Sequence, residues 1–191
     1  MSIDTDKGID TDKGIDTTKN IDVDRLNELS EKNKADPEIG HKKISVKSVT
    51  ESGFRNLNFA RDHKPFLISE PHPLLGDDQA PNPTEYALGA LGSCINVGIQ
   101  AIASHRGVTL TKIEIELEGD IDISAVWGVG DLDPEKELGI TTVRANISLD
   151  GDADDATLQK ISDDAVKWSP VANTFIRPVA LETSTTTGSS S

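Results

Sequence analysis

The sequence predicts an α+β fold, and three observations support this prediction. Segments of alternating polar and apolar residues are grouped early in the chain, and one long uncharged segment of helical length follows them. Two more alternating segments then come before a segment with helical periodicity. Strands and helices that are grouped in this way are typical of antiparallel sheets packed on helices, whereas strict alternation is typical of a parallel sheet.

The two ends of the chain have compositions that do not favour a packed core. The first residues repeat a six-residue unit, Ile-Asp-Thr-Asp-Lys-Gly, and the last are all Ser, Thr or Gly. Such segments bury too little apolar surface to offset the entropy lost when they become ordered. We therefore expect a flexible acidic repeat tail plus a short helix over 1–40, one folded domain over 41–182, and a disordered polar tail over 183–191.

The first strands are predicted where apolar residues alternate with polar ones. This pattern occurs over 41–50, 54–60 and 65–69, and the charged run Arg61-Asp62-His63-Lys64 separates the second segment from the third. Three short alternating segments joined by polar turns predict a β-meander. Before them, the spacing of apolar residues over 23–36 predicts the short amphipathic helix.

The central element is a predicted helix from Thr84 to about His105, after a proline-rich loop. Residues 86–104 contain no charged side chain, and the length of this segment raises the question of a membrane span. Several glycines and amide side chains make it only mildly apolar, so we expect a buried helix and no membrane association. At 1.5 Å per residue the helix is about 30 Å long, and other elements must cover it on nearly all sides.

The second half of the chain contains five more predicted elements, which complete the domain. They are strands over 111–123 and 141–149, a helix over 154–168, a short helix with Ser169 as N-cap and Pro170 as its first residue, and a last strand over 178–182.

Composition excludes several classes of function. The net charge is −14 and the pI is 4.6, which argues against binding to nucleic acid because such binding needs a basic surface. The N-terminal residues have no signal-peptide pattern and there is one cysteine, so we expect a cytoplasmic protein. The histidines lack ligand spacing, and the calcium-like run that starts at Asp150 has Asp155 where a glycine is needed. We therefore predict no metal and no cofactor.

Three runs of residues resemble the OsmC/Ohr family. They are Leu75-Gly76-Asp77-Asp78-Gln79-Ala80-Pro81-Asn82-Pro83-Thr84-Glu85-Tyr86 with Ala90-Leu91-Gly92-Ser93-Cys94, then His105-Arg106-Gly107-Val108 with Glu116-Leu117-Glu118-Gly119-Asp120-Ile121-Asp122, and Ser169-Pro170-Val171-Ala172-Asn173-Thr174. This resemblance implies an OsmC-like fold over 41–182, in which antiparallel sheets wrap around two long central helices of an intertwined homodimer. A partner chain would then supply the missing cover of the central helix.

The resemblance also implies a thiol-based activity. Well-characterised relatives are peroxidases in which a cysteine thiolate attacks a hydroperoxide, while an arginine held by a glutamate stabilises the thiolate. Cys94 matches that cysteine, and Arg55 is the better match to the arginine, with Arg61 as the alternative. Glu85 is the candidate glutamate, although Thr84 occupies the place where the peroxidase glutamate stands.

Ser169 marks a branch of the family that lacks the second cysteine. In the peroxidases that cysteine closes a disulfide with the first, which a hydroxyl group cannot do. One hypothesis is therefore a stress-response hydroperoxide reductase that uses Cys94 and an external thiol reductant. The alternative is a non-enzymatic dimeric protein that binds an apolar small molecule at the dimer interface. The alternative for each residue is a purely structural role: Cys94 is a small core residue, Glu85 is a favourable charge in the first helical turn, and Ser169 is an N-cap.

Overall fold

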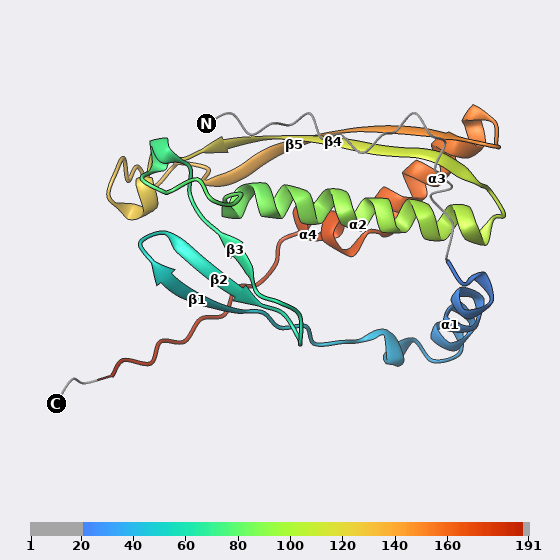
Figure 1. The fold of residues 1–191 in the computed structure, drawn as a ribbon, viewed down its shortest axis with the longest axis horizontal. Coiled ribbons are helices and arrows are strands. Elements are labelled where there is room, and N and C mark those ends of the chain that lie inside the picture. The colour runs from blue at the N-terminus through green and yellow to red at the C-terminus, as the bar shows by residue number, and fades with distance from the viewer. Residues whose placement is uncertain (1–20, 189–191) are drawn as a thin grey trace.

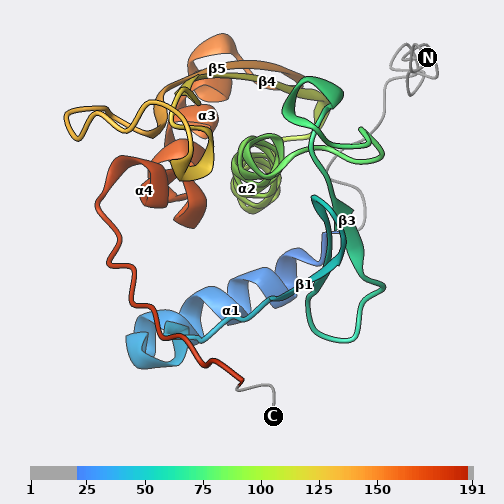
Figure 2. The same ribbon diagram turned by 90° about the vertical axis from the view of Figure 1, so that its left-hand side faces the viewer.

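The computed structural model describes residues 21–188, so most of the predicted repeat tail and the last three residues lie outside the described part. Helix α2 (Pro83–His105) runs through the middle of the molecule. A two-stranded sheet covers one side of it, helices α3 and α4 lie beside it, and a three-stranded sheet lies on the other side (Figures 1 and 2). The predicted mixture of antiparallel sheets and helices is confirmed.

Helix α2 begins at a complete set of N-terminal signals. Pro83 is its first residue, and the Asn82 side chain accepts a hydrogen bond from the backbone of Glu85. The helix ends at His105, before Gly107 adopts a left-handed backbone. By length and composition this one described helix could cross a membrane. However, Leu91, Ile95, Ile99 and Ala103 form a buried stripe along it, as in the core helix of a globular domain.

The two-stranded sheet is a long hairpin packed on α2. Strands β4 (Leu110–Asp122) and β5 (Gly139–Gly151) pair in antiparallel fashion over almost their whole length. Their apolar side faces the helix, where a Cβ atom on Gly92 would approach Leu117 to 2.9 Å. The glycine therefore lets this strand lie close to the helix within one chain.

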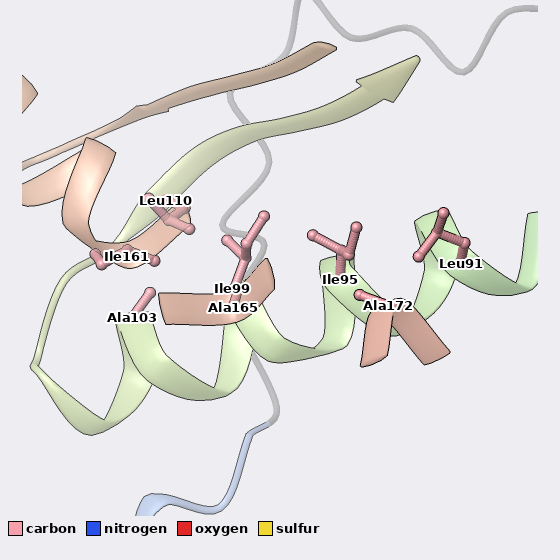
Figure 3. Close-up of a cluster of buried hydrophobic side chains, with 8 residues drawn as sticks. All are labelled: Leu91, Ile95, Ile99, Ala103, Leu110, Ile161, Ala165 and Ala172. Atoms are coloured by element: carbon pink, nitrogen blue, oxygen red, sulfur yellow. The ribbon is translucent and has the colours of Figure 1, made fainter. Parts of the chain in front are cut away.

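Helices α3 (Asp155–Trp168) and α4 (Pro170–Ile176) complete the core. Ile161 and Ala165 from α3 and Ala172 from α4 pack against the buried stripe of α2, together with Leu110 (Figure 3). A Cβ atom on Gly98 would lie 3.3 Å from that of Ala165, so this glycine also serves packing inside the chain.

The three-stranded sheet has the predicted meander topology, in the order β1-β2-β3. Its strands are β1 (Lys47–Ser52), β2 (Arg55–Phe59) and β3 (Phe66–Ile68). It is attached to α2 through Tyr86, whose hydroxyl donates to the Leu67 carbonyl at 2.8 Å and whose ring packs on Phe66. All residues of β1 are exposed, so this sheet has little core of its own.

Two strand predictions need correction. The first strand starts at Lys47 instead of residue 41, because residues 41–46 have no neighbouring strand and Ile44 is fully open to solvent. The last strand, predicted over 178–182, is wrong: this segment is extended but unpaired, and Leu181 is 88% exposed. Its apolar alternation is present, but no strand of the same chain lies beside it to complete a ladder.

Helix α1 (Val23–Ala35) confirms the short predicted helix to within one residue. The Asp22 side chain accepts from the Arg25 backbone and so caps its start. The helix lies near the C-terminal end of α2, where the Asn27 side chain is 2.7 Å from the His105 ring (Figure 1). The described part of the polar C-terminal tail, 183–188, is exposed and has no helix or strand.

Candidate active site

Cys94 lies in the middle of α2, at the border between its buried stripe and its open face. At 100° per residue it is about 100° from Ile95 and about 60° from Val97 around the helix. Ile95 is buried and Val97 is 66% exposed, and Cys94 itself is half-buried. As the only cysteine of the chain it has a free thiol. This thiol therefore borders a surface of the helix that no other described part of the chain covers.

Arg55 is held by two carboxylates that do not include the predicted one. Its Nε donates to Glu51 Oε2 at 2.7 Å and its Nη1 donates to Asp77 Oδ2 at 2.6 Å. These bonds raise the pKa of Arg55 above its ordinary value, with the bond to Asp77 as the largest cause. Arg61, the alternative arginine, lies exposed in the turn after β2 and has no hydrogen bond or ion pair within residues 21–188.

Asp77 lies in the first run of residues that resembles the family, although no role was predicted for it. Its Oδ1 accepts a hydrogen bond of 2.5 Å from the hydroxyl of Ser69, while Oδ2 takes the bond from Arg55. These two bonds, that of Ser69 first, lower the pKa of Asp77 to about 2. The resemblance to the family includes Asp77, so it could have been considered as a site residue. Sequence spacing, however, does not tell which carboxylate bonds to Arg55.

Glu85 closes the capping box at the start of α2. Its carboxylate accepts from the Asn82 backbone at 2.7 Å, and its own backbone N–H donates to the Asn82 side chain at 2.9 Å. It therefore occupies the first-turn position that its purely structural role predicts. No hydrogen bond or ion pair joins Cys94, Arg55 and Glu85 to one another in the described structure, so their catalytic roles remain predictions.

Ser169, which stands at the place of the second cysteine, is the N-cap of α4. Its hydroxyl accepts from the Ala172 backbone at 3.1 Å, and the residue is 3% exposed. The predicted N-cap is thus confirmed. Within the described residues, no group of three or more His, Cys, Asp or Glu side chains is placed to hold a metal ion.

A cavity of about 850 Å³, which no sequence motif predicted, lies near the N-terminal end of α2. Glu70, Leu88 and Trp127 are among the residues that line it, and Cys94 is not. The ring of Trp127 packs on Phe54 from the β1–β2 turn, with ring centroids 5.3 Å apart. The sequence held one signal for the cavity: apolar residues, among them Val126 and Trp127, follow the predicted strand 111–123, where a solvated loop would not need them.

Comparison with solved structures shows which proteins share this fold. An OsmC-like protein from Mycoplasma pneumoniae is 15% identical, with a TM-score of 0.56 over 71% of this chain and 88% of that one. An OsmC-like protein of unknown function from Vibrio cholerae is also 15% identical, with a TM-score of 0.56 over 70% and 93%. An organic hydroperoxide resistance protein OsmC from Legionella pneumophila is 16% identical, with a TM-score of 0.53 over 69% and 88%.

The sequence itself carries the family signature. No curated protein matches this chain closely enough to transfer a function. The sequence model of the family described as OsmC-like protein, however, matches residues 76–184, which is more than half of the chain. This range contains Cys94, Glu85 and Ser169, and it confirms the resemblance that the sequence motifs indicated. The chain belongs to the OsmC-like protein family.

Proposed function

We propose that this protein is a thiol-dependent hydroperoxide reductase that uses Cys94 and an external thiol reductant. One observation carries the proposal: the single thiol lies half-buried on the central helix, at the edge of its open face. The OsmC-like sequence match and the organic hydroperoxide resistance protein among the structural neighbours support it. We also propose a cytoplasmic location, which suits a free thiol.

The proposed reaction has two stages. The Cys94 thiolate attacks the outer oxygen of an organic hydroperoxide, the O–O bond breaks, and the alkoxide leaving group takes up a proton to become an alcohol. Cys94 is then a sulfenic acid. An external thiol attacks its sulfur and releases water, and a second external thiol releases Cys94 as the thiol together with an external disulfide. Ser169 takes no part in this cycle.

The charged residues around Arg55 suggest a revised division of roles. In the proposal, Arg55 remains the cation that stabilises the thiolate. Because its two hydrogen-bonded partners are Asp77 and Glu51, we assign the task of holding the arginine to Asp77. The carboxylate of Glu85 is used in the capping box, so in this proposal its role is to stabilise the start of α2.

A homodimer is part of the proposal. The open face of α2, where Val97 is 66% exposed, and the unpaired segment 178–182 are the kinds of surface that a second copy would cover. The same open apolar face favours the second candidate function, a non-enzymatic dimer that binds an apolar small molecule at its interface. In that case Cys94 would only line the site.

The experiment compares the wild-type protein with Cys94→Ser, with Ser93→Ala as the control on the next residue. We expect the wild type and Ser93→Ala to consume cumene hydroperoxide in the presence of dithiothreitol, and the wild type to form a dimedone-reactive sulfenic acid. Cys94→Ser should fall to the uncatalysed rate. Equal consumption by wild type and Cys94→Ser would falsify the proposal.

The pH dependence of Cys94 alkylation separates the two candidate functions. A catalytic thiolate reacts with iodoacetamide rapidly below neutral pH, whereas an ordinary thiol, with a pKa of about 8.5, reacts slowly there. Rapid labelling at pH 6 supports the reductase. Slow labelling, combined with saturable binding of an apolar probe by the dimer, supports the second candidate.

A further inference from the structure

The cavity near the N-terminal end of α2 has walls that are mostly apolar. Leu88 from α2, Ile121 from the end of β4 and Leu138 from the loop before β5 contribute to them. Its volume of about 850 Å³ lies in the range of small-molecule sites, which is roughly 300–1,000 Å³. The β4–β5 loop and the start of α2 lie at the same end of the molecule (Figure 1). A single chain therefore forms a pocket large enough for a small molecule, and Cys94 does not line this pocket.

The wall at Trp127 has an unusual backbone. Val126 and Trp127 both have positive φ angles, 40° and 51°, although neither is a glycine. This left-handed conformation is unfavourable for a β-branched or bulky residue, so the surrounding contacts must hold it. The packing of Trp127 on Phe54 is one such contact, and it keeps the indole at the cavity.

Glu70 is the polar residue that the cavity makes conspicuous. It is 9% exposed, and its carboxylate has no hydrogen bond or ion pair to any residue in 21–188. Burial, and then the nearby charge of Glu85, raise the pKa of Glu70. Arg55, which bonds to Asp77 in the loop that follows Glu70, already pairs with Asp77 and Glu51. A carboxylate that is shielded from most of the solvent and has no partner is destabilised, and a positively charged group would reduce that cost.

The backbone around Glu70 is fixed, so its place at the cavity wall is well defined. Its carbonyl accepts a hydrogen bond from the Asp78 backbone at 3.1 Å. Gly76 passes so close that an added Cβ atom would lie 1.8 Å from the same carbonyl oxygen, which only a glycine permits. Glu70 and Glu85 both line the cavity, and they are close enough for the charge of Glu85 to act on Glu70.

We propose that this cavity binds a small amphipathic cation, in which a protonated amine is attached to an apolar body. The ammonium group would lie between the carboxylates of Glu70 and Glu85, and the apolar body would lie against Leu88 and Trp127. An anionic ligand would meet three acidic side chains of the lining, Glu70, Glu85 and Asp122, of which only Asp122 has a counter-charge among the described residues, Lys136 at 3.5 Å. A neutral apolar ligand would pack against the apolar walls of the cavity but leave Glu70 without a partner.

The test uses three octyl probes that share one apolar body. Trp168→Phe leaves Trp127 as the only tryptophan of the full chain, so that its emission reports on the cavity. Octylammonium, 1-octanol and octanoate are titrated, and calorimetry checks the affinities. We expect saturable binding of octylammonium at least about tenfold tighter than that of octanol, as a charge-assisted hydrogen bond provides, and the weakest binding for octanoate.

Substitutions in the same background locate the amine. Glu70→Gln should reduce octylammonium affinity to about that of octanol and leave octanol binding unchanged. Glu116→Gln removes the same charge from the exposed side of β4 and should have no effect. Equal affinities of octylammonium and octanol in the wild type, no saturable octylammonium binding, or an unaffected Glu70→Gln variant would each overturn the proposal. The wild-type comparison holds even if Glu70→Gln fails to fold.

Discussion

Two regions of this molecule bury their apolar residues to very different degrees. In the core region (residues 83–176), α2, β4, α3 and α4 share one cluster of buried side chains (Figure 3). In the first sheet (β1–β3), every residue of β1 is exposed, and Tyr86 provides the hydrogen bond that ties β3 to α2. The match to the OsmC-like family, over residues 76–184, covers the core region and leaves out the first sheet.

This difference indicates which apolar surfaces are covered within one chain and which are not. The core region pairs its two strands with each other and packs its buried cluster within the chain, and it leaves open the face of α2 around Val97. The first sheet and the segment 178–182 have the alternation of strands but lack a covering layer in the same chain. A sheet that is exposed on its apolar side gains stability when another surface covers it, which is why we propose a second copy there.

The largest expected effect is the loss of a core side chain. Ile99 is fully buried, so Ile99→Ala should lower the free energy of unfolding by about 2–5 kcal/mol through the lost burial and the cavity left behind. The matched change in the first sheet, Val49→Ala, removes a side chain that is 41% exposed and should cost less than about 1 kcal/mol. Urea unfolding of dilute protein, followed by circular dichroism, measures both. Equal losses would contradict the contrast between the regions.

The second effect concerns the open face of α2. Because Val97 is 66% exposed in the chain, Val97→Lys should leave the fold intact but place a charge in the proposed dimer interface. We expect the dimer dissociation constant to rise at least about thirtyfold, as for the loss of an interface hot spot. Sedimentation velocity over a range of concentrations measures it, with Val97→Ala as the milder control. A wild-type chain that sediments as a monomer throughout would rule out the dimer.

Sequence reasoning predicted the fold well because its signals are local. The uncharged run that follows Asn82 and Pro83 predicts α2, and alternation over 111–123 and 141–149 predicts strands β4 and β5. It failed where a strand needs a neighbour: alternation over 178–182 is present, but strand pairing is a property of two segments.

The candidate site was less predictable, because ion pairs depend on three-dimensional proximity. The sequence singled out Cys94 and Arg55, but it paired the arginine with Glu85 instead of Asp77. These two carboxylates lie eight residues apart: Asp77 is in the loop before α2, where it reaches Arg55, and Glu85 is in the first turn of α2, where it closes the capping box. The cavity at Glu70 was not predicted at all, since its walls come from segments far apart in the sequence.

A smaller effect is expected at the start of α4. Ser169→Ala removes the hydroxyl that accepts from the Ala172 backbone, and loss of such an N-cap costs about 1 kcal/mol of stability. Ser93→Ala, on the exposed side of α2, is the control and should change the unfolding free energy by less than about 0.5 kcal/mol. Thermal and urea unfolding compare the two. If both variants are as stable as the wild type, the cap at Ser169 contributes nothing.

The smallest effect, and the one most specific to the first sheet, is the acid limb of stability. Asp77 has a pKa of about 2 in the folded protein, against 3.8 for the unperturbed group, so the unfolded chain binds its proton more readily. The stabilisation by Asp77 is therefore complete above about pH 4 and is lost as the pH falls towards 2. Asp77→Asn should be less stable than the wild type at neutral pH and should lose less stability over this interval.

Asp78→Asn provides the control for this prediction, because it removes the same charge from the next residue of the loop. In the described structure the Asp78 side chain has no hydrogen bond or ion pair, so this variant should keep the acid limb of the wild type. Urea unfolding at pH values from 2 to 7 compares the three proteins. Parallel stability curves for the wild type and Asp77→Asn would mean that the bonds from Ser69 and Arg55 do not fasten the first sheet to the loop before α2.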